Sequence, residues 1–127
     1  MTDAVLDASA LLAFLRKEKG AEKVASVLTG SCICAVNLAE TYSKMVEYGK
    51  RLDEVVYQVE RLRIPFIPFD AELAATAASL WPVTRAAGLS LGDRACLALA
   101  LKTSLPAFTT EDAWLKVNVG VKVVKIR

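Results

Sequence analysis

The sequence lacks histidine, and this absence removes the usual general base near neutral pH and a very common metal ligand. Its 3 cysteines are an odd set without a C-x-x-C motif, so neither a disulfide framework nor a cysteine-based zinc site is expected. Cys32, Cys34 and Cys96 all stand in apolar sequence, which indicates buried thiols in a reducing compartment. A metal site in this chain would therefore need oxygen ligands.

A large excess of one charge and a long hydrophobic run are also absent. The 16 basic and 14 acidic side chains leave a net charge of +2, which does not indicate nucleic-acid binding through overall charge. The longest apolar run, Ala95 to Leu101, is far shorter than the roughly 20 residues that cross a bilayer. No basic segment followed by an apolar stretch and a small-residue cleavage site opens the chain, so we expect a cytoplasmic protein.

The apolar content is high. Hydrophobic residues make up 54% of the 127 residues and charged residues 24%, which excludes disorder and predicts a well-filled interior. A chain of this length is close to the commonest size of one domain. We therefore expect residues 1–127 to form a single domain.

Short apolar runs alternate with longer periodic segments, as a parallel sheet covered by helices requires. The predicted strands are Ala4 to Leu6, Cys32 to Val36, Pro65 to Phe69, Pro106 to Thr109 and Val121 to Ile126. Helices are expected at about residues 9–16, 21–29, 37–48, 51–63, 71–87, 90–102 and 111–117. The sequence therefore predicts an α/β fold.

Side chains that can accept hydrogen bonds from first-turn amides predict where helices begin. These are Asp7 or Ser9, Asn37, Asp70 and Ser90. The predicted helix stops are Gly20, Gly30, Gly49 and Gly88. Pro82 should bend or interrupt its helix, because it has no amide donor and crowds the preceding turn.

Two acids stand out from the charged surface. Asp7 directly follows the first strand, at the sheet edge where open α/β folds bind ligands, although it could instead be a helix N-cap. Asp93 lies in the first turn of a helix that continues as an apolar run, where a carboxylate needs a partner. Its alternative role is a capping box with Ser90, for which Asp is poorer than Glu at reaching back. We interpret Asp93 as functional.

Three more acids follow predicted strands. Glu40 lies near the start of the helix after the second strand, and its spacing alone predicts a solvated position away from the apolar face. Glu111 and Asp112 follow the fourth strand, where they could also be the charged first turn of a short helix.

The carboxyl ends of parallel strands share one edge of a sheet, so these acids should form a cluster. Crowded carboxylates raise each other's pKa unless a cation lies among them, and an oxygen-only set suits Mg²⁺ or Mn²⁺. Such an ion lowers the pKa of a bound water, a function that this chain cannot obtain from histidine. The sequence therefore predicts a divalent-metal site.

Four segments together resemble the PIN-domain nucleases, and within them the VapC-like toxins of toxin–antitoxin pairs. They are Val5 to Leu11, Asn37 to Glu40, Leu89 to Ala95 and Phe108 to Trp114, in the family's order from the first strand to the last. The resemblance implies a three-layer α/β/α sandwich with a central parallel sheet. It also implies an acidic pocket that holds Mg²⁺ or Mn²⁺ and hydrolyses phosphodiester bonds in RNA.

By the same resemblance Asp7, Glu40 and Asp93 are the three main acids, with catalytic and metal-binding roles. The family usually shows Thr-x-Asp before the tryptophan region. Aligning that region places Glu111 at the fourth acid, whereas a shift of one residue would place Asp112 there.

Other side chains have supporting roles in this interpretation. Ser9 and Thr110 could assist the acids through their hydroxyls. Arg94 could contact a phosphate or pair with an acid. The helices from Asn37 to Arg63 carry more apolar surface than one flank of a small sheet needs, and the resemblance implies a homodimer plus an antitoxin that fills the acidic groove.

Other classes of function require different sequence features. A phosphoacceptor receiver domain expects paired acids after the first strand and a lysine that closes the last, which does not fit the lone Asp7. A PIN-like module that binds RNA or protein without cutting stays open. The 6 glycines never form G-x-x-x-x-G-K, which excludes a P-loop NTPase.

Overall fold

The computed structural model describes residues 4–127, and its centre is a five-stranded sheet in the order β3-β2-β1-β4-β5. Every neighbouring pair of strands is parallel. The strands are β1 (Ala4–Leu6), β2 (Ser31–Cys34), β3 (Phe66–Ile67), β4 (Ala107–Thr109) and β5 (Val123–Lys125). The predicted parallel sheet is thus confirmed, with strands shorter than predicted everywhere except at β1.

Helices connect the strands. They are α1 (Ala8–Leu15), α2 (Ala21–Val27), α3 (Ala35–Glu47), α4 (Leu52–Glu60), α5 (Ala71–Ser79), α6 (Trp81–Thr84) and α7 (Leu91–Thr103), with 3-10 turns η1 (Leu28–Gly30), η2 (Arg85–Ala87) and η3 (Asp112–Lys116). The helix expected over 71–87 is divided, and Pro82 lies in the first turn of α6, as its missing amide predicts. The helix expected over 111–117 is a 3-10 turn.

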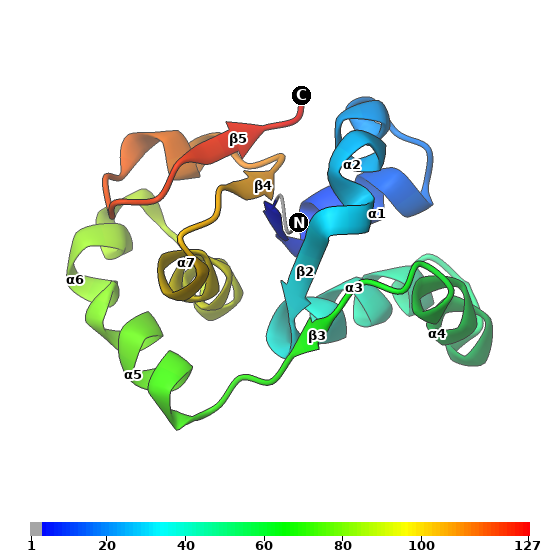
Figure 1. Ribbon diagram of the computed structural model, residues 1–127, viewed down its shortest axis with the longest axis horizontal. Coiled ribbons are helices and arrows are strands. Elements are labelled where there is room, and N and C mark those ends of the chain that lie inside the picture. Colours follow the sequence, from blue (N-terminus) through cyan, green and yellow to red (C-terminus); the bar gives the residue numbers. More distant parts are fainter. Residues whose placement is uncertain (1–3) are drawn as a thin grey trace.

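The sheet lies between two apolar cores. Val5 and Ala107 point to the side covered by α5 and α7, whereas Leu6 and Phe108 point to the side covered by α1 to α4. Figure 1 shows these two groups of helices on opposite sides of the strands. Alternate strand residues thus supply alternate cores, which confirms the three-layer α/β/α sandwich.

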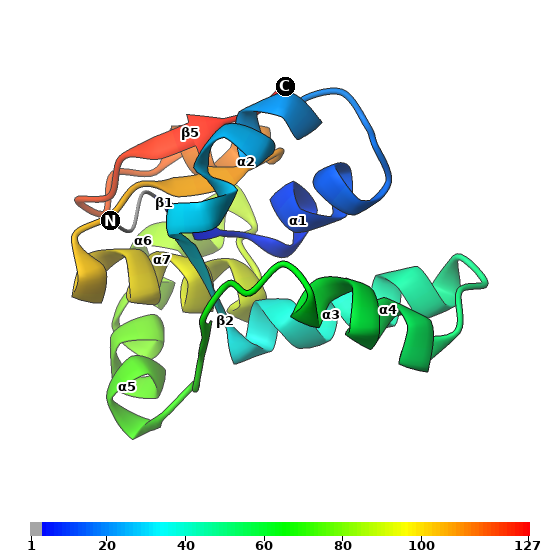
Figure 2. The ribbon, with the colours of Figure 1, turned by 45° about the vertical axis from the view of Figure 1, so that its right-hand side comes forward.

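Two helices have particular importance for the site. Residues Ala95 to Ala100 of α7 are all buried, so this helix passes through the interior beneath the sheet. Figure 2 shows α3 and α4 projecting from the sheet as a pair of helices. No helix in residues 4–127 has the length and apolar character that crossing a membrane requires.

The predicted helix ends have mixed outcomes. Asp70 Oδ1 accepts a hydrogen bond from Leu73 N at 2.9 Å, so the predicted cap of α5 is confirmed. Asn37 does not cap α3, because the helix already begins at Ala35 and Asn37 lies inside its first turn. Gly49 and Gly88 follow α3 and η2 as predicted, but Gly20 precedes α2 and does not end α1, which ends at Leu15.

Candidate functional site

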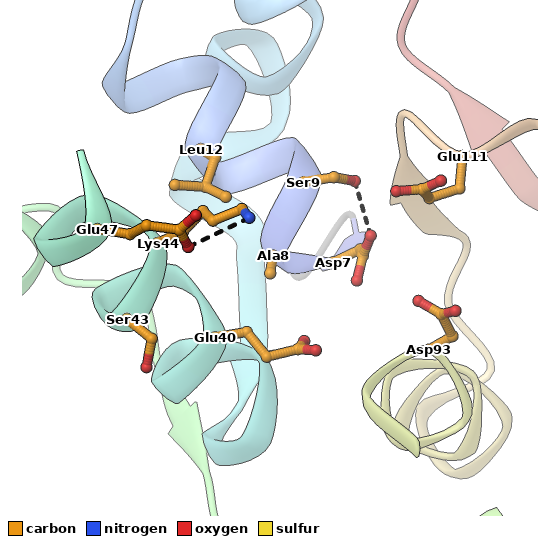
Figure 3. Close-up of a pocket in the computed structure, with 10 residues that line it drawn as sticks. All are labelled: Asp7, Ala8, Ser9, Leu12, Glu40, Ser43, Lys44, Glu47, Asp93 and Glu111. Atoms are coloured by element: carbon orange, nitrogen blue, oxygen red, sulfur yellow. Dashed lines mark hydrogen bonds and ion pairs between the residues drawn. The ribbon is translucent and has the colours of Figure 1, made fainter. Parts of the chain in front are cut away.

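A pocket of about 410 Å³ opens at the carboxyl edge of the sheet. The strand order reverses between β1 and β4, which is where open α/β sheets form a ligand-binding crevice. Acids from four segments line this pocket: Asp7 after β1, Glu40 on α3, Asp93 on α7 and Glu111 after β4. Figure 3 shows their side chains around one opening. The structure therefore brings together the four acids that the sequence selected.

Asp7 is the most buried of these acids, with 3% of its surface exposed. It occupies the N-cap position of α1, yet its side chain makes no capping hydrogen bond. Instead, Oδ2 accepts hydrogen bonds from Ser9 Oγ at 2.7 Å and Thr109 Oγ1 at 3.0 Å. Among the described residues no hydrogen bond reaches Oδ1. The carboxylate is thus held by one oxygen, and the other is available to a ligand.

Thr109 belongs to a hydroxyl network that the sequence analysis missed. Thr109 Oγ1 also accepts from Glu111 N at 3.1 Å, and Ser9 Oγ accepts from Thr110 N at 3.0 Å. The hydroxyl that supports Asp7 therefore belongs to Thr109 and not, as expected, to Thr110. Ser9 supports an acid through its hydroxyl, as expected. Leu6 pairs with Phe108 across β1 and β4, so the next residues, Asp7 and Thr109, must be neighbours. Knowledge of this strand register would have identified Thr109 as a partner of Asp7.

Burial controls the electrostatics of Asp7. Loss of water around the carboxyl raises its pKa from 3.8 to about 7, because burial penalises the charged form. The Ser9 hydroxyl lowers this pKa, the charge of Asp93 raises it, Thr109 lowers it, and Glu40 raises it. A cation beside Asp7 would stabilise the ionised form that its surroundings disfavour.

Asp93 combines both roles that the sequence offered for it. Its Oδ2 accepts a hydrogen bond from Ser90 N at 2.8 Å, while its own N donates to Ser90 Oγ at 3.2 Å. The capping box is therefore complete, and the expectation that Asp reaches back poorly is wrong here. The box fixes the carboxylate at the helix start, where it also lines the pocket. Capping thus orients this acid.

Glu40 is exposed, as its spacing predicted, and its side chain also lines the pocket. Its Oε1 accepts a hydrogen bond from Asn37 Nδ2 at 3.0 Å, and its carboxylate lies over Gly92 of α7. Partial burial raises the pKa of Glu40, the Asn37 hydrogen bond lowers it, and the charge of Asp93 raises it. The exposure of Glu40 agrees with its spacing, whereas its contact with Gly92 arises because α7 packs beside this face of α3, which helix periodicity cannot reveal.

The structure distinguishes the two acids after β4. Glu111 lines the pocket, whereas Asp112 forms an ion pair with Lys125 Nζ at 2.8 Å. The Lys125 hydrogen bond and charge hold the pKa of Asp112 below its usual range. The register that places Glu111 at the fourth acid therefore agrees with the geometry of this edge.

Three charged residues make contacts that the sequence did not predict. Lys44 and Glu47 also line the pocket and pair at 3.3 Å. They follow Glu40 at helical spacing, so a search for polar residues on that face of α3 could have found them. Arg94 does not line the pocket; its Nη1 donates to Ala77 O on α5 at 3.0 Å, and it has no ion pair among residues 4–127. Neither role suggested for Arg94 describes this contact.

The donor set suits a hard divalent cation, although it is not a closed cage. In residues 4–127, no three acidic or cysteine side chains are close enough to form a metal-binding group as they stand. Four carboxylates instead surround an open pocket, and buried Asp7 presents an oxygen without a hydrogen bond. Mg²⁺ commonly keeps several water ligands beside one or two carboxylates, so this arrangement fits it.

Comparison with solved structures finds the same fold in several bacterial proteins. The chain is similar to a chain of a toxin–antitoxin complex from Klebsiella pneumoniae, with a TM-score of 0.74, 17% identity and 98% of each chain covered. A DNA-bound VapBC structure from Salmonella typhimurium gives a TM-score of 0.73, 17% identity and 100% of each chain covered. FitAcB from Neisseria gonorrhoeae gives a TM-score of 0.72, 22% identity and 97% of each chain covered.

Sequence comparison identifies the family. No curated protein sequence matches the chain significantly. The profile of the PIN domain, however, matches residues 4–119. This match spans both sides of the sheet and all four acids of the pocket. The chain therefore belongs to the PIN-domain family.

Proposed function

We propose that this protein is a divalent-metal-dependent endoribonuclease that acts in the cytoplasm as the toxin of a toxin–antitoxin pair. The observation that carries this proposal is buried Asp7, whose unbonded oxygen shares one pocket with three further acids. A buried carboxylate without a partner destabilises a fold, so a buried Asp7 beside three further acids is expected where a cation binds.

Asp7, Glu40, Asp93 and Glu111 are the proposed ligands of Mg²⁺ or Mn²⁺. When bound, the ion supplies an attacking water of lowered pKa and neutralises negative charge on the phosphate. The protein orients the ligands, because the hydroxyls of Ser9 and Thr109 fix one oxygen of Asp7. The capping box fixes Asp93 in the same way.

The toxin role is supported by family membership and by the kind of complexes to which the similar structures belong. One of those structures is a toxin–antitoxin complex, and another is a VapBC complex bound to DNA. The proposed partners are accordingly an RNA substrate, an antitoxin protein and a second copy of this chain. A receiver domain fits less well, since such domains have strand order 2-1-3-4-5 while this sheet has 3-2-1-4-5.

RNA cleavage tests the proposal directly. Purified protein without any inhibitor should cleave single-stranded or structured RNA when Mg²⁺ or Mn²⁺ is present, and should stop when EDTA removes the ion. An Asp93→Asn variant serves as the control for contaminating ribonuclease. Undiminished cleavage in EDTA would refute metal dependence, and RNA binding without cleavage by the metal-loaded protein would favour a noncatalytic PIN-like module.

A further inference from the structure

A buried asparagine connects two of the pocket acids from behind. Asn37 on α3 has 0% exposure, and its Nδ2 donates to Glu40 Oε1 at 3.0 Å and to the carbonyl oxygen of Gly92 at 2.9 Å. Gly92 directly precedes Asp93 on α7. A single amide group thus joins the Glu40 carboxylate to the backbone that carries Asp93. Figure 3 shows the side chains of these two acids at the pocket.

The contact with Glu40 explains why residue 92 is glycine. Gly92 does not have a positive φ, so its backbone conformation does not require glycine, and glycine is a poor helix former. A Cβ at this position would lie 2.5 Å from Cδ and 2.6 Å from Oε1 of Glu40. The long Glu40 side chain would move before the helix did. The absence of a side chain therefore leaves the space that the Glu40 carboxylate occupies.

The chemistry of Asn37 is set by its two acceptors. Reversing the amide would place Oδ1 against a carboxylate oxygen and a carbonyl oxygen, neither of which can donate. In the observed orientation, Oδ1 is buried and has no partner among the described residues. Such an orphaned acceptor destabilises a fold, so an apolar residue would suit packing better. The role of Asn37 therefore lies in what its Nδ2 group holds.

We propose that Asn37 and Gly92 are positioning residues for the divalent cation. Asn37 sets the direction of the Glu40 carboxylate relative to Asp93, and Gly92 provides the space for that carboxylate. Neither residue contacts the ion. This inference rests on the proposed function, since it assigns both residues to the same metal-binding acids.

Calorimetric titration of the metal-free protein with Mn²⁺ measures this role without an activity assay. Asn37→Leu removes the donor at similar size, and Gly92→Ala displaces the Glu40 carboxylate while improving helix propensity. Each variant should weaken Mn²⁺ affinity by about 10- to 100-fold, the usual effect of residues that orient ligands. Thr84→Val is the matched control, because Thr84 is a buried polar residue of α6 whose hydroxyl donates to the backbone carbonyl oxygen of Leu80, away from the pocket. It should bind Mn²⁺ as the wild type does.

A double-mutant cycle separates positioning from general destabilisation. In a Glu40→Ala background, Asn37→Leu and Gly92→Ala should cause no further loss of affinity, because the side chain they position is gone. Thermal unfolding should show that Gly92→Ala is at least as stable as the wild type. Full losses in the Glu40→Ala background, or wild-type affinity of both single variants, would overturn the inference. A wild-type protein that binds no Mn²⁺ would instead overturn the proposed function.

Discussion

At the scale of single residues, Asp7 shows how the surroundings change a side chain. Its carboxyl is buried against β4, and burial raises its pKa from 3.8 to about 7. A carboxyl whose pKa is raised by folding contributes stability that is fully present below its unfolded pKa. That contribution is lost as the pH rises through the folded pKa. Metal-free protein should therefore become less stable between about pH 4 and pH 7.

Asp7→Asn removes this titration. In metal-free protein, the stability of Asp7→Asn relative to the wild type should increase from about pH 4 to pH 7 and then level off. A shift of this size corresponds to an upper limit of about 4 kcal/mol. Denaturant unfolding at several pH values in EDTA measures the difference. Saturating Mn²⁺ should stabilise only the wild type, and a difference that does not vary with pH would contradict the assignment.

Glu111 and Asp112 are adjacent but have separate environments. Glu111→Gln should lower Mn²⁺ affinity by at least about tenfold, because it removes a charge that lines the pocket. Asp112→Asn is the matched control, since it breaks only the ion pair with Lys125 on the exposed side. Parallel calorimetric titrations compare the two. A larger loss for Asp112→Asn would reverse the choice between them.

At the scale of elements, the start of α7 connects folding to the site. Ser90 caps the helix and belongs to the box that holds Asp93. Ser90→Ala should lower the free energy of unfolding by about 1 kcal/mol, the usual effect of losing an N-cap side chain. It should also weaken Mn²⁺ binding, because the lost hydrogen bond from Asp93 N to Ser90 Oγ fixes the backbone that carries the Asp93 carboxylate.

Asp70→Ala provides the control for Ser90→Ala. Asp70 caps α5 through Leu73 N, and it does not line the pocket. Its loss should cause a similar decrease in stability and leave Mn²⁺ affinity unchanged. Equal effects of both variants on affinity would mean that the cap of α7 has no particular connection to the site.

At the scale of the whole molecule, α3 and α4 present apolar side chains to solvent. Met45, Val55 and Val59 are buried, so part of the apolar surface expected over 37–63 belongs to the core. Other side chains of these helices and their connection remain exposed: Val46, Tyr48, Leu52 and Tyr57. A second exposed group, which includes Val83, lies on α6 at the far side of the sheet. The expectation that another chain covers α3 and α4 therefore stays a prediction.

Light scattering at micromolar concentration should report a homodimer. Val46→Glu and Leu52→Glu should shift the equilibrium toward monomer, because each places a charge among the exposed apolar side chains of α3 and α4. Val83→Glu adds the same charge to an equally exposed site elsewhere and should leave the dimer intact. Dissociation by Val83→Glu alone would move the interface to α6, and a monomeric wild type would contradict the prediction.

The sequence by itself determined the fold class and the acids of the pocket. Alternation of short apolar runs with periodic segments predicts a parallel sheet, and acids after the strands must then share an edge. Asp7, Glu40 and Glu111 follow predicted strands, Asp93 opens an apolar helix, and the family resemblance joins the four. Each of these signals is local along the chain, so no packing information was needed to recognise it.

Only the tertiary structure decided how those acids are held. The register between β1 and β4 makes Thr109 the neighbour of Asp7, and the sequence of such short strands does not reveal that register. Asn37 had the local pattern of a helix cap, but β2 ends at Cys34 and α3 already begins at Ala35. The side-chain amide of Asn37 therefore lies inside the helix and donates to the carbonyl oxygen of Gly92 on α7. Contacts between segments far apart in the chain arise when helices pack against the sheet. The physical reason is that local periodicity fixes which face a residue occupies, while packing fixes which residue it meets there.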